Sequence, residues 1–112
     1  MQKQSEAEFQ SQVRALCRFY GLTVYHTHNS QRSDPGFPDL VIVGRRGVLF
    51  RELKTETGRV KPMQRHWIDV LRLAGQDADV WRPSDLERIK LELRALGKVE
   101  LQQPLRAVKT RR

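Results

Sequence analysis

The spacing of apolar residues along the chain follows two periods, and the longer one predicts three helices. Apolar side chains recur three and four positions apart over residues 9–20, 63–74 and 86–96, a spacing that gathers them on one face of a helix. Each run is closed by a glycine, the residue most favoured at helix C-termini: Gly21, Gly75 and Gly97.

The starts of these helices carry recognisable signals. In a capping box, a Ser hydroxyl and a carboxylate three residues later each accept the other residue's backbone N–H. Ser5 with Glu8 has this form before the first helix, and Ser84 with Glu87 repeats it before the last. Pro62 suits the first turn of the middle helix, where its missing N–H costs nothing.

The shorter period predicts four strands. Residues 22–26 alternate between apolar and polar, and residues 39–43 and 48–54 are rich in β-formers on either side of a turn at 44–47, which predicts a hairpin. Residues 79–82 follow a helical crossover and should run parallel to the strand before it. The expected fold is α/β, a mixed sheet flanked by helices in the order αβββαβα.

The charge balance favours a polyanionic partner. The 112 residues suffice for one domain and include 21 Lys and Arg against 13 Asp and Glu, a formal charge of +8. Nucleic acid is the simplest partner for such a surplus, although a membrane surface or a ribosomal role also fits the charge alone. The longest strictly apolar run, residues 40–43, is far short of the roughly 20 residues that cross a bilayer.

Cysteine usage and the two ends of the chain suggest where the protein works. The single cysteine, Cys17, excludes an internal disulfide and a Cys-rich zinc module. The N-terminus lacks the apolar core of a signal peptide, so we expect a cytoplasmic protein, or one of the host cytoplasm if it is viral. Residues 97–112 hold five basic residues against one acidic residue, which predicts a basic C-terminal tail after a folded domain of residues 1–96.

The candidate chemistry lies at one end of the expected hairpin. Side chains alternate between the faces of a strand, so Glu52 and Lys54 point the same way, with about 7 Å between their Cα atoms. If the turn pairs Val43 with Val48, Asp39 lies close to both, whereas a slip of one residue would turn a whole strand over. In the first register, two carboxylates and an ammonium group share one patch.

Such a patch is suited to phosphodiester hydrolysis. Neighbouring carboxylates repel unless one takes up a proton or a cation lies between them. Because only hard oxygen donors are available, the expected cation is Mg²⁺ or Mn²⁺ and not zinc. Lys54 would then hold or help deprotonate the attacking water and offset the charge that develops on the phosphate.

These residues resemble a known family of enzymes. Pro38-Asp39, followed beyond a hairpin by Glu52-Leu53-Lys54, resembles the PD-(D/E)xK nuclease superfamily, and its surroundings are similar to the VRR-NUC branch, including the free-standing, virus-type members. The similarity covers residues 6–96 and implies a restriction-endonuclease-like fold. The other residues that carry it are Gly36, Phe37, Leu40, Gln64, Trp67, Leu71, Gly75, Val80, Trp81 and Ser84.

The resemblance implies a role for each matching residue. Asp39 and Glu52 would bind the metal together with the main-chain carbonyl of Leu53, and Lys54 would be the catalytic lysine. Gln64 matches a glutamine that helps to position the lysine or the substrate. Glu8 matches a glutamate that reaches the same metal, while its spacing from Ser5 suits a helix cap equally well.

The resemblance also implies a substrate. The family cleaves structured DNA with a divalent metal, and its free-standing members resemble homodimeric resolvases of four-way (Holliday) junctions, whereas others cut flaps or resect ends. Alternatives are a flap-cutting, end-processing or restriction nuclease of the same fold, and a basic nucleic-acid-binding protein without catalysis. Six basic residues could follow DNA phosphates or be ordinary solvated surface: Arg32, Arg45, Arg46, Arg59, Lys61 and Arg65.

Overall fold

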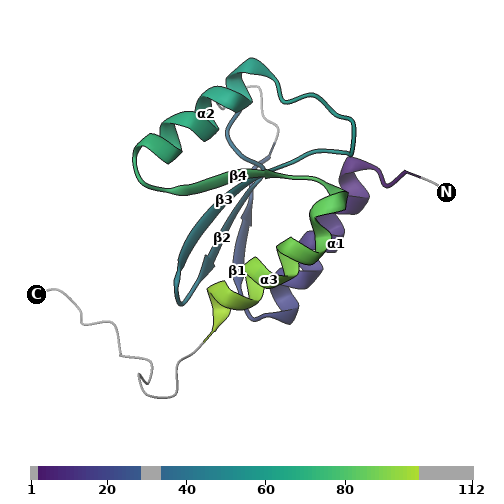
Figure 1. Ribbon diagram of the computed structural model, residues 1–112, viewed down its shortest axis with the longest axis vertical. Coiled ribbons are helices and arrows are strands. Elements are labelled where there is room, and N and C mark those ends of the chain that lie inside the picture. Colours follow the sequence, from purple (N-terminus) through teal and green to yellow (C-terminus); the bar gives the residue numbers. More distant parts are fainter. Residues whose placement is uncertain (1–2, 29–33, 99–112) are drawn as a thin grey trace, which may run out of the picture.

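The computed structural model describes residues 3–28 and 34–98, and the helices and strands in them follow the predicted αβββαβα order (Figure 1). A short 3₁₀ helix, η1, is added between the last strand and the last helix. The elements are α1 (Glu6–Phe19), β1 (Thr23–His26), β2 (Leu40–Gly44), β3 (Gly47–Leu53), α2 (Pro62–Leu73), β4 (Asp77–Trp81), η1 (Pro83–Asp85) and α3 (Leu86–Gly97).

The four strands form one mixed sheet in the order β1-β2-β3-β4. β2 is antiparallel to both β1 and β3, and β4 is parallel to β3, as a helical crossover requires. Val43 pairs with Val48, so the predicted hairpin register is confirmed. α1 and α3 lie together on one side of the sheet, and α2 lies apart from them at the other (Figure 1).

The main hydrophobic core lies between the sheet and the pair α1 and α3. Every third or fourth residue of the two helices faces it, because that spacing returns to the same side of a helix. Cys17 is completely buried here, and burial raises the pKa of its thiol to about 11, so it acts as a small apolar residue. The core residues are Phe9, Val13, Cys17, Leu22, Leu40, Ile42, Leu49, Leu53, Trp81, Ile89, Leu93 and Leu96.

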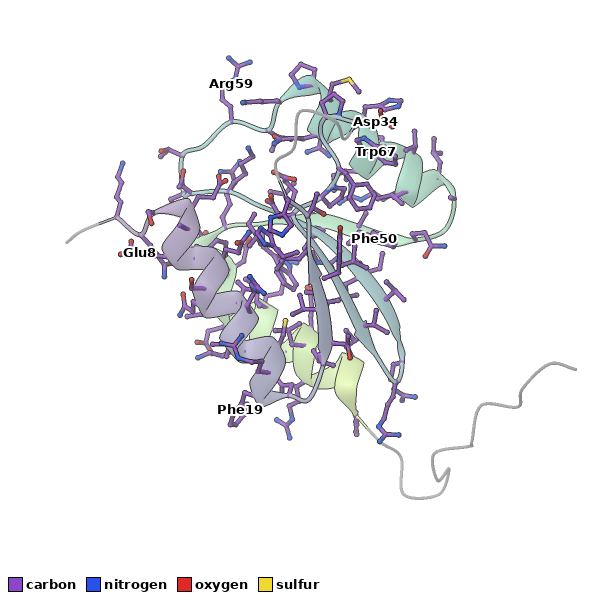
Figure 2. All side chains as sticks on the ribbon, turned by 180° about the vertical axis from the view of Figure 1, so that it is seen from behind. Glu8, Phe19, Asp34, Phe50, Arg59 and Trp67 are labelled. Carbon is purple, nitrogen blue, oxygen red and sulfur yellow. The ribbon has the colours of Figure 1, made fainter. Side chains whose placement is uncertain are left out.

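A smaller aromatic cluster joins α2 to the other face of the sheet. The ring of Phe37 makes edge contacts with Phe50 of β3 and with Trp67 of α2, at centroid distances of 6.2 and 5.0 Å. The Trp67 indole N–H donates to the carbonyl of Pro35 at 3.1 Å. Figure 2 shows Trp67 and Phe50 on this side of the sheet, with Asp34 close to Trp67.

Gly36 allows the segment before β2 to approach α2 closely. Its φ is +91°, and a Cβ at this position would lie 2.6 Å from the backbone carbonyl carbon of Met63. Only glycine fits such a contact without displacing the backbone. The chain therefore enters β2 from a segment that is fixed against the first turn of α2.

One predicted helix cap is wrong. Ser84 lies inside η1 and its N–H donates to the Glu56 carboxylate at 2.9 Å, so it does not form a capping box with Glu87. Asp85 instead accepts the backbone N–H of Arg82 at 2.8 Å. The turn that precedes α3 is thus closed by an aspartate one residue after the predicted cap.

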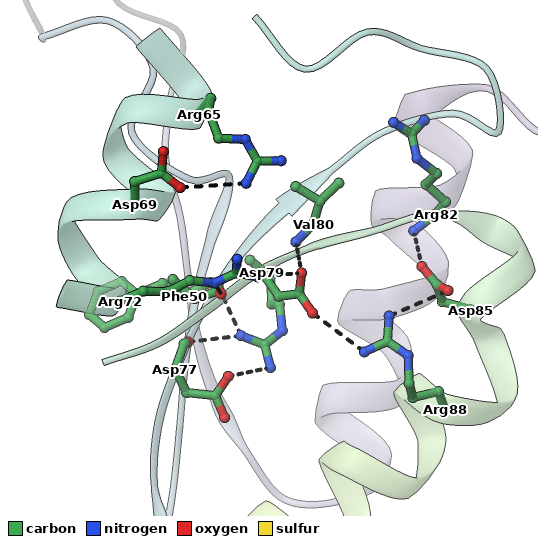
Figure 3. A network of polar contacts seen from close by, with 12 residues as sticks. Phe50, Arg65, Asp69, Arg72, Asp77, Asp79, Val80, Arg82, Asp85 and Arg88 are labelled. Carbon is green, nitrogen blue, oxygen red and sulfur yellow. Dashed lines mark hydrogen bonds and ion pairs between the residues drawn. The ribbon is translucent and has the colours of Figure 1, made fainter. Parts of the chain in front are cut away.

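β4 begins at Asp77, earlier than the predicted strand of residues 79–82. Asp77 and Asp79 interrupt the run of β-forming residues that predicts a strand. Arginines from β3, α2 and α3 pair with their carboxylates (Figure 3). Asp77 lies 2.8 Å from the guanidinium of the buried Arg51, and Asp79 lies 3.0 Å from Arg72 and 3.5 Å from Arg88.

The C-terminal end of the described chain is helical. α3 runs to Gly97, as its glycine signal predicts, and residues 99–112 of the expected basic tail lie outside the described residues. The division of the chain at residue 97 stays a prediction. Among the residues that the structure describes, no helix has the length and apolar character that crossing a membrane requires.

Candidate active site

Asp39 is held in place from both sides at the start of β2. Its carboxylate Oδ2 accepts the backbone N–H of Leu53 in β3 at 2.8 Å, and its carbonyl accepts the N–H of Thr27 at 2.8 Å. The Thr27 hydroxyl also donates to the carbonyl of Pro38 at 2.8 Å. The hairpin and the end of β1 therefore fix both the backbone and the side chain of this aspartate.

Glu52 and Lys54 face the same side of β3 and are almost completely buried. Their side chains are only 3% and 8% exposed, and Lys54 Nζ lies 3.7 Å from Glu52 Oε2. The register of the hairpin places Asp39 directly beyond the last β2 residue that pairs with β3, next to Glu52. The structure thus brings together the three residues that the sequence singled out.

The electrostatics of Glu52 reflect this crowding. Burial raises the pKa of Glu52 to about 8, with further raising contributions from the charge of Asp39 and from a hydrogen bond with it. Lys54 acts in the opposite direction but does not restore the ordinary value. Without a cation, the raised pKa favours the protonated form of Glu52 near neutral pH, and a bound cation would compete with this proton.

The oxygen donors at this point fit a hard divalent cation. Since the N–H of Leu53 points toward Asp39, its carbonyl points to the same edge of the strand, as both groups of one strand residue do. Two carboxylates and a carbonyl form a set suited to Mg²⁺ or Mn²⁺, which retain several waters. Within residues 3–28 and 34–98, no group of three or more His, Cys, Asp or Glu side chains could hold a metal ion by itself.

Glu8 forms the helix cap that its spacing from Ser5 suggests. Its carboxylate accepts the N–H of Ser5 at 2.8 Å, and its own N–H donates to the Ser5 hydroxyl oxygen at 3.1 Å. The side chain is exposed near the N-terminal end of α1 (Figure 2), and the backbone hydrogen bond from Ser5 lowers its pKa. The capping box is confirmed, while the role of Glu8 as a metal ligand stays a prediction.

A different glutamate of α1 acts on the site. The charge of Glu6 contributes to the raised pKa of Glu52. Glu6 is exposed on the first turn of α1, three residues before the buried Phe9, and Glu8 lies about 200° around the helix from it. Glu6 was not predicted from the sequence to act on the site.

Gln64 also has a local partner. Its side-chain oxygen accepts the backbone N–H of Lys61 at 2.9 Å, which caps the start of α2. The side chain is half-buried on the first turn of this helix. Its predicted role in positioning the lysine or the substrate stays a prediction.

The predicted DNA-contacting residues fall into two groups. Arg59 and Lys61 are exposed on the loop that continues from Lys54, and Arg59 projects from the molecule in Figure 2. Arg65 is exposed on α2 and forms an ion pair of 3.6 Å with Asp69. These three residues belong to the part of the chain that directly follows the site.

The second group is remote from the carboxylates. Arg45 and Arg46 form the turn of the hairpin, and strands of this length put them about 20 Å from Glu52. Arg32 lies outside the described residues. The structure thus separates the hairpin arginines from the loop that carries Arg59.

Two histidines lie at the same end of the sheet as the carboxylates. The rings of His26 and His28 have a centroid distance of 5.1 Å. Burial lowers the pKa of His26, and the charge of Arg14 lowers it further, whereas Asp39 opposes the shift. His66 is exposed on α2, and no metal-binding role follows for any of the three.

Comparisons with known proteins agree on one family. The family model of the VRR-NUC domain matches residues 3–85. A solved structure described as a VRR-NUC domain protein has a TM-score of 0.66 at 20% identity and covers 87% of this chain and 93% of its own. A second, described as a VRR-NUC domain, has a TM-score of 0.63 at 24% identity over 75% and 91% of the two chains. No curated protein matches the chain.

A third solved structure extends the likeness to a resolvase. It is Hjc of Archaeoglobus fulgidus, a Holliday junction resolvase from an archaeal hyperthermophile. The TM-score is 0.51 at 20% identity, and the match covers 67% of this chain and 66% of Hjc. At this low identity, the structural similarity concerns the fold alone. It confirms the expected restriction-endonuclease-like α/β fold.

Proposed function

The chain belongs to the VRR-NUC family of nucleases with the PD-(D/E)xK fold, and we propose that it is a Mg²⁺- or Mn²⁺-dependent endonuclease of branched DNA. The observation that carries the proposal is the meeting of Asp39, Glu52 and Lys54 at one end of a hairpin, with the lysine ammonium 3.7 Å from the Glu52 carboxylate. Burying an acid and an amine together, beside a second acid that is half-buried, is costly unless a ligand compensates their charges.

Each residue has a distinct part in this chemistry. Asp39, Glu52 and the carbonyl of Leu53 would hold the cation, which when bound supplies Lewis-acid activation of the phosphate and of a water molecule. The ammonium of Lys54 orients the attacking water and offsets negative charge as it develops on the phosphate. The hydrogen bond from Leu53 keeps the carboxylate of Asp39 in a fixed position during this step.

Branched DNA is the proposed substrate because of charge and fold. The net charge of +8 suits a partner with a high density of phosphates. The fold is similar to that of Hjc, which is described as a Holliday junction resolvase. A four-way junction presents equivalent strands that must be cut as a pair, so we propose that the protein works as a homodimer with one site for each strand.

The proposal is tested with a panel of labelled DNA substrates. Purified protein is incubated with a four-way junction, a flap, a duplex and a single strand, in Mg²⁺, in Mn²⁺ and in EDTA. We expect cleavage of the junction in either metal and none in EDTA. Preferred cleavage of the flap or of a duplex end would instead assign the same site to end processing. Full activity in EDTA would refute the requirement for a divalent metal.

Lys54→Ala is the catalytic control for this panel. The substitution removes the ammonium but no metal-binding oxygen, so DNA binding should stay within about twofold of wild type while the cleavage rate falls by at least about a hundredfold. Binding is measured by fluorescence anisotropy and cleavage on denaturing gels. Retention of DNA without strand breakage by the wild-type protein would indicate a binding protein and contradict the proposal.

A further inference from the structure

The loop that follows the candidate catalytic lysine is held by one arginine. The Nη1 atom of Arg82 donates to the carbonyl oxygens of Thr55, Glu56 and Gly58, at 2.6, 3.3 and 2.8 Å. Carbonyl oxygens that point at one place repel each other unless a cation or a donor lies between them. The Arg82 guanidinium supplies both, and this keeps the three carbonyls of residues 55–58 turned inward.

The backbone around Arg82 strengthens this attachment. The residue before it, Trp81, accepts the N–H of Lys54 at 3.0 Å, and Ser84 donates its N–H to the Glu56 carboxylate at 2.9 Å. The segment after β4 therefore lies along the segment after β3 as far as residue 58. Residues distant in sequence fix the stretch that begins at the lysine.

Among the described residues, the side chain of Arg82 donates hydrogen bonds to this loop alone. Its backbone N–H binds Asp85, but in Figure 3 its guanidinium extends away from the ion pairs that join Asp85, Arg88 and Asp79. None of the carboxylates in residues 3–28 and 34–98 forms an ion pair with it. Its hydrogen bonds to backbone carbonyls are thus the contacts that fix its position.

The loop in turn contacts the lysine. A Cβ on Gly58 would lie 3.6 Å from Cδ of Lys54 and 2.9 Å from the hydroxyl oxygen of Thr55. The loop therefore folds back against the aliphatic part of the lysine, which is one reason why this side chain is only 8% exposed. A loop released from Arg82 would let the lysine chain move away from Glu52.

We propose that Arg82 is a positioning residue for Lys54. By holding residues 55–58 against the lysine side chain, it keeps the ammonium beside Glu52. Arg82 acts through the loop and needs no contact with the reacting atoms. The inference rests on the proposed function, because it requires Lys54 to take part in the reaction.

The test separates a positioning effect from a binding effect. Arg82→Met keeps most of the apolar volume and removes every donor, so we expect kcat for the preferred DNA substrate to fall about tenfold to a hundredfold with KM changed by less than about threefold. Arg82→Lys should recover most of kcat, because an ammonium group has three N–H donors for the same carbonyls. A residue that only attracted DNA would raise KM and leave kcat unchanged.

Arg72→Met is the matched control. Like Arg82, Arg72 donates to a backbone carbonyl, in its case that of Ala78 in β4 at 2.7 Å. It also pairs with Asp79 at 3.0 Å, and neither partner belongs to the loop after Lys54. Both Met variants remove a cation and a guanidinium–carbonyl contact, and both should lower the thermal unfolding midpoint by a similar amount. Only the Arg82 variant should lose kcat.

Gly58→Ala changes the loop itself and leaves Arg82 unchanged. The new methyl group meets the Thr55 hydroxyl at 2.9 Å, so Thr55 must shift. Because the Thr55 carbonyl is one of the three that Arg82 holds, we expect kcat to fall as in Arg82→Met. If Arg82→Met does not fold, this variant and Arg82→Lys decide the question. Wild-type kcat in Arg82→Met or Gly58→Ala, beside an inactive Lys54→Ala, would overturn the inference alone, whereas an inactive wild-type protein would overturn the proposed function.

Discussion

The side chain of Glu52 is almost completely buried, with Asp39 beside it. Burial raises its pKa from 4.5 to about 8, so between these values the folded protein holds a proton that the unfolded chain releases. A state that binds more protons loses stability as the pH rises. The metal-free protein should therefore become less stable from about pH 5 to pH 8.

Glu52→Gln tests this dependence. Glutamine carries no charge at any pH, so the variant should lose less stability than the wild-type protein between pH 5 and pH 8, by about 3.5 kcal/mol. The measurement is urea denaturation in EDTA at several pH values. Parallel pH profiles for the two proteins would show that Glu52 ionises normally in the folded state.

The same proton makes metal binding depend on pH. A cation at Asp39 and Glu52 must displace the proton, so Mn²⁺ affinity should fall roughly tenfold for each pH unit below 8. Isothermal titration calorimetry in buffers of different ionisation enthalpy measures both the affinity and the proton released. An affinity that is constant from pH 6 to pH 8 would contradict the prediction.

At the level of single elements, α1 illustrates how one helix serves two purposes. Its buried face carries core residues, and the charge of the exposed Glu6 on its first turn contributes to the raised pKa of Glu52. Its opposite side carries the capping box of Ser5 and Glu8. The box satisfies backbone N–H groups that the helix itself leaves unpaired.

Ser5→Ala and Glu8→Ala therefore should behave alike. Each removes one half of the capping box, so both should lower the free energy of unfolding, Ser5→Ala by about 1 kcal/mol, and both should leave metal affinity within twofold of wild type. Chemical denaturation and calorimetry measure the two quantities. A loss of Mn²⁺ affinity in Glu8→Ala alone would instead make Glu8 a ligand.

The elements also show what the sequence could and could not reveal. Asp39, Glu52 and Lys54 were predictable because strand alternation and one hairpin register fix their relative positions. The contacts of Arg82 were not, since its partners are backbone carbonyls 24–27 residues away and leave no pattern in the sequence. The predicted cap at Ser84 was wrong because Asp85, the next residue, accepts the N–H of Arg82 and closes the turn.

Across the whole molecule, the described basic residues that were predicted to contact DNA fall into two separate groups. Arg59 lies on the loop after the site, and Arg45 lies at the hairpin turn about 20 Å away. We expect a DNA strand bound at the carboxylates to pass the first and not to need the second. The two arginines are both exposed and differ mainly in position.

Arg59→Ala and Arg45→Ala form a matched pair for this division. Arg59→Ala should weaken junction binding and reduce the slope of log Kd against log salt by about one, the effect of one lost phosphate contact. Arg45→Ala should change the slope by much less. Anisotropy titrations from low to physiological salt measure both, and equal slopes would show that DNA spans the whole sheet.

The position of the hairpin turn has a consequence for chain length. The acids and the lysine occupy the open end of β2 and β3, while the turn at 44–47 occupies the closed end. The turn also contacts α3, because the N–H of Arg46 donates to the carbonyl of Leu96 at 3.1 Å. We expect a reporter peptide inserted at the turn to disturb this contact and to leave the spacing of the reacting groups at the open end unaltered.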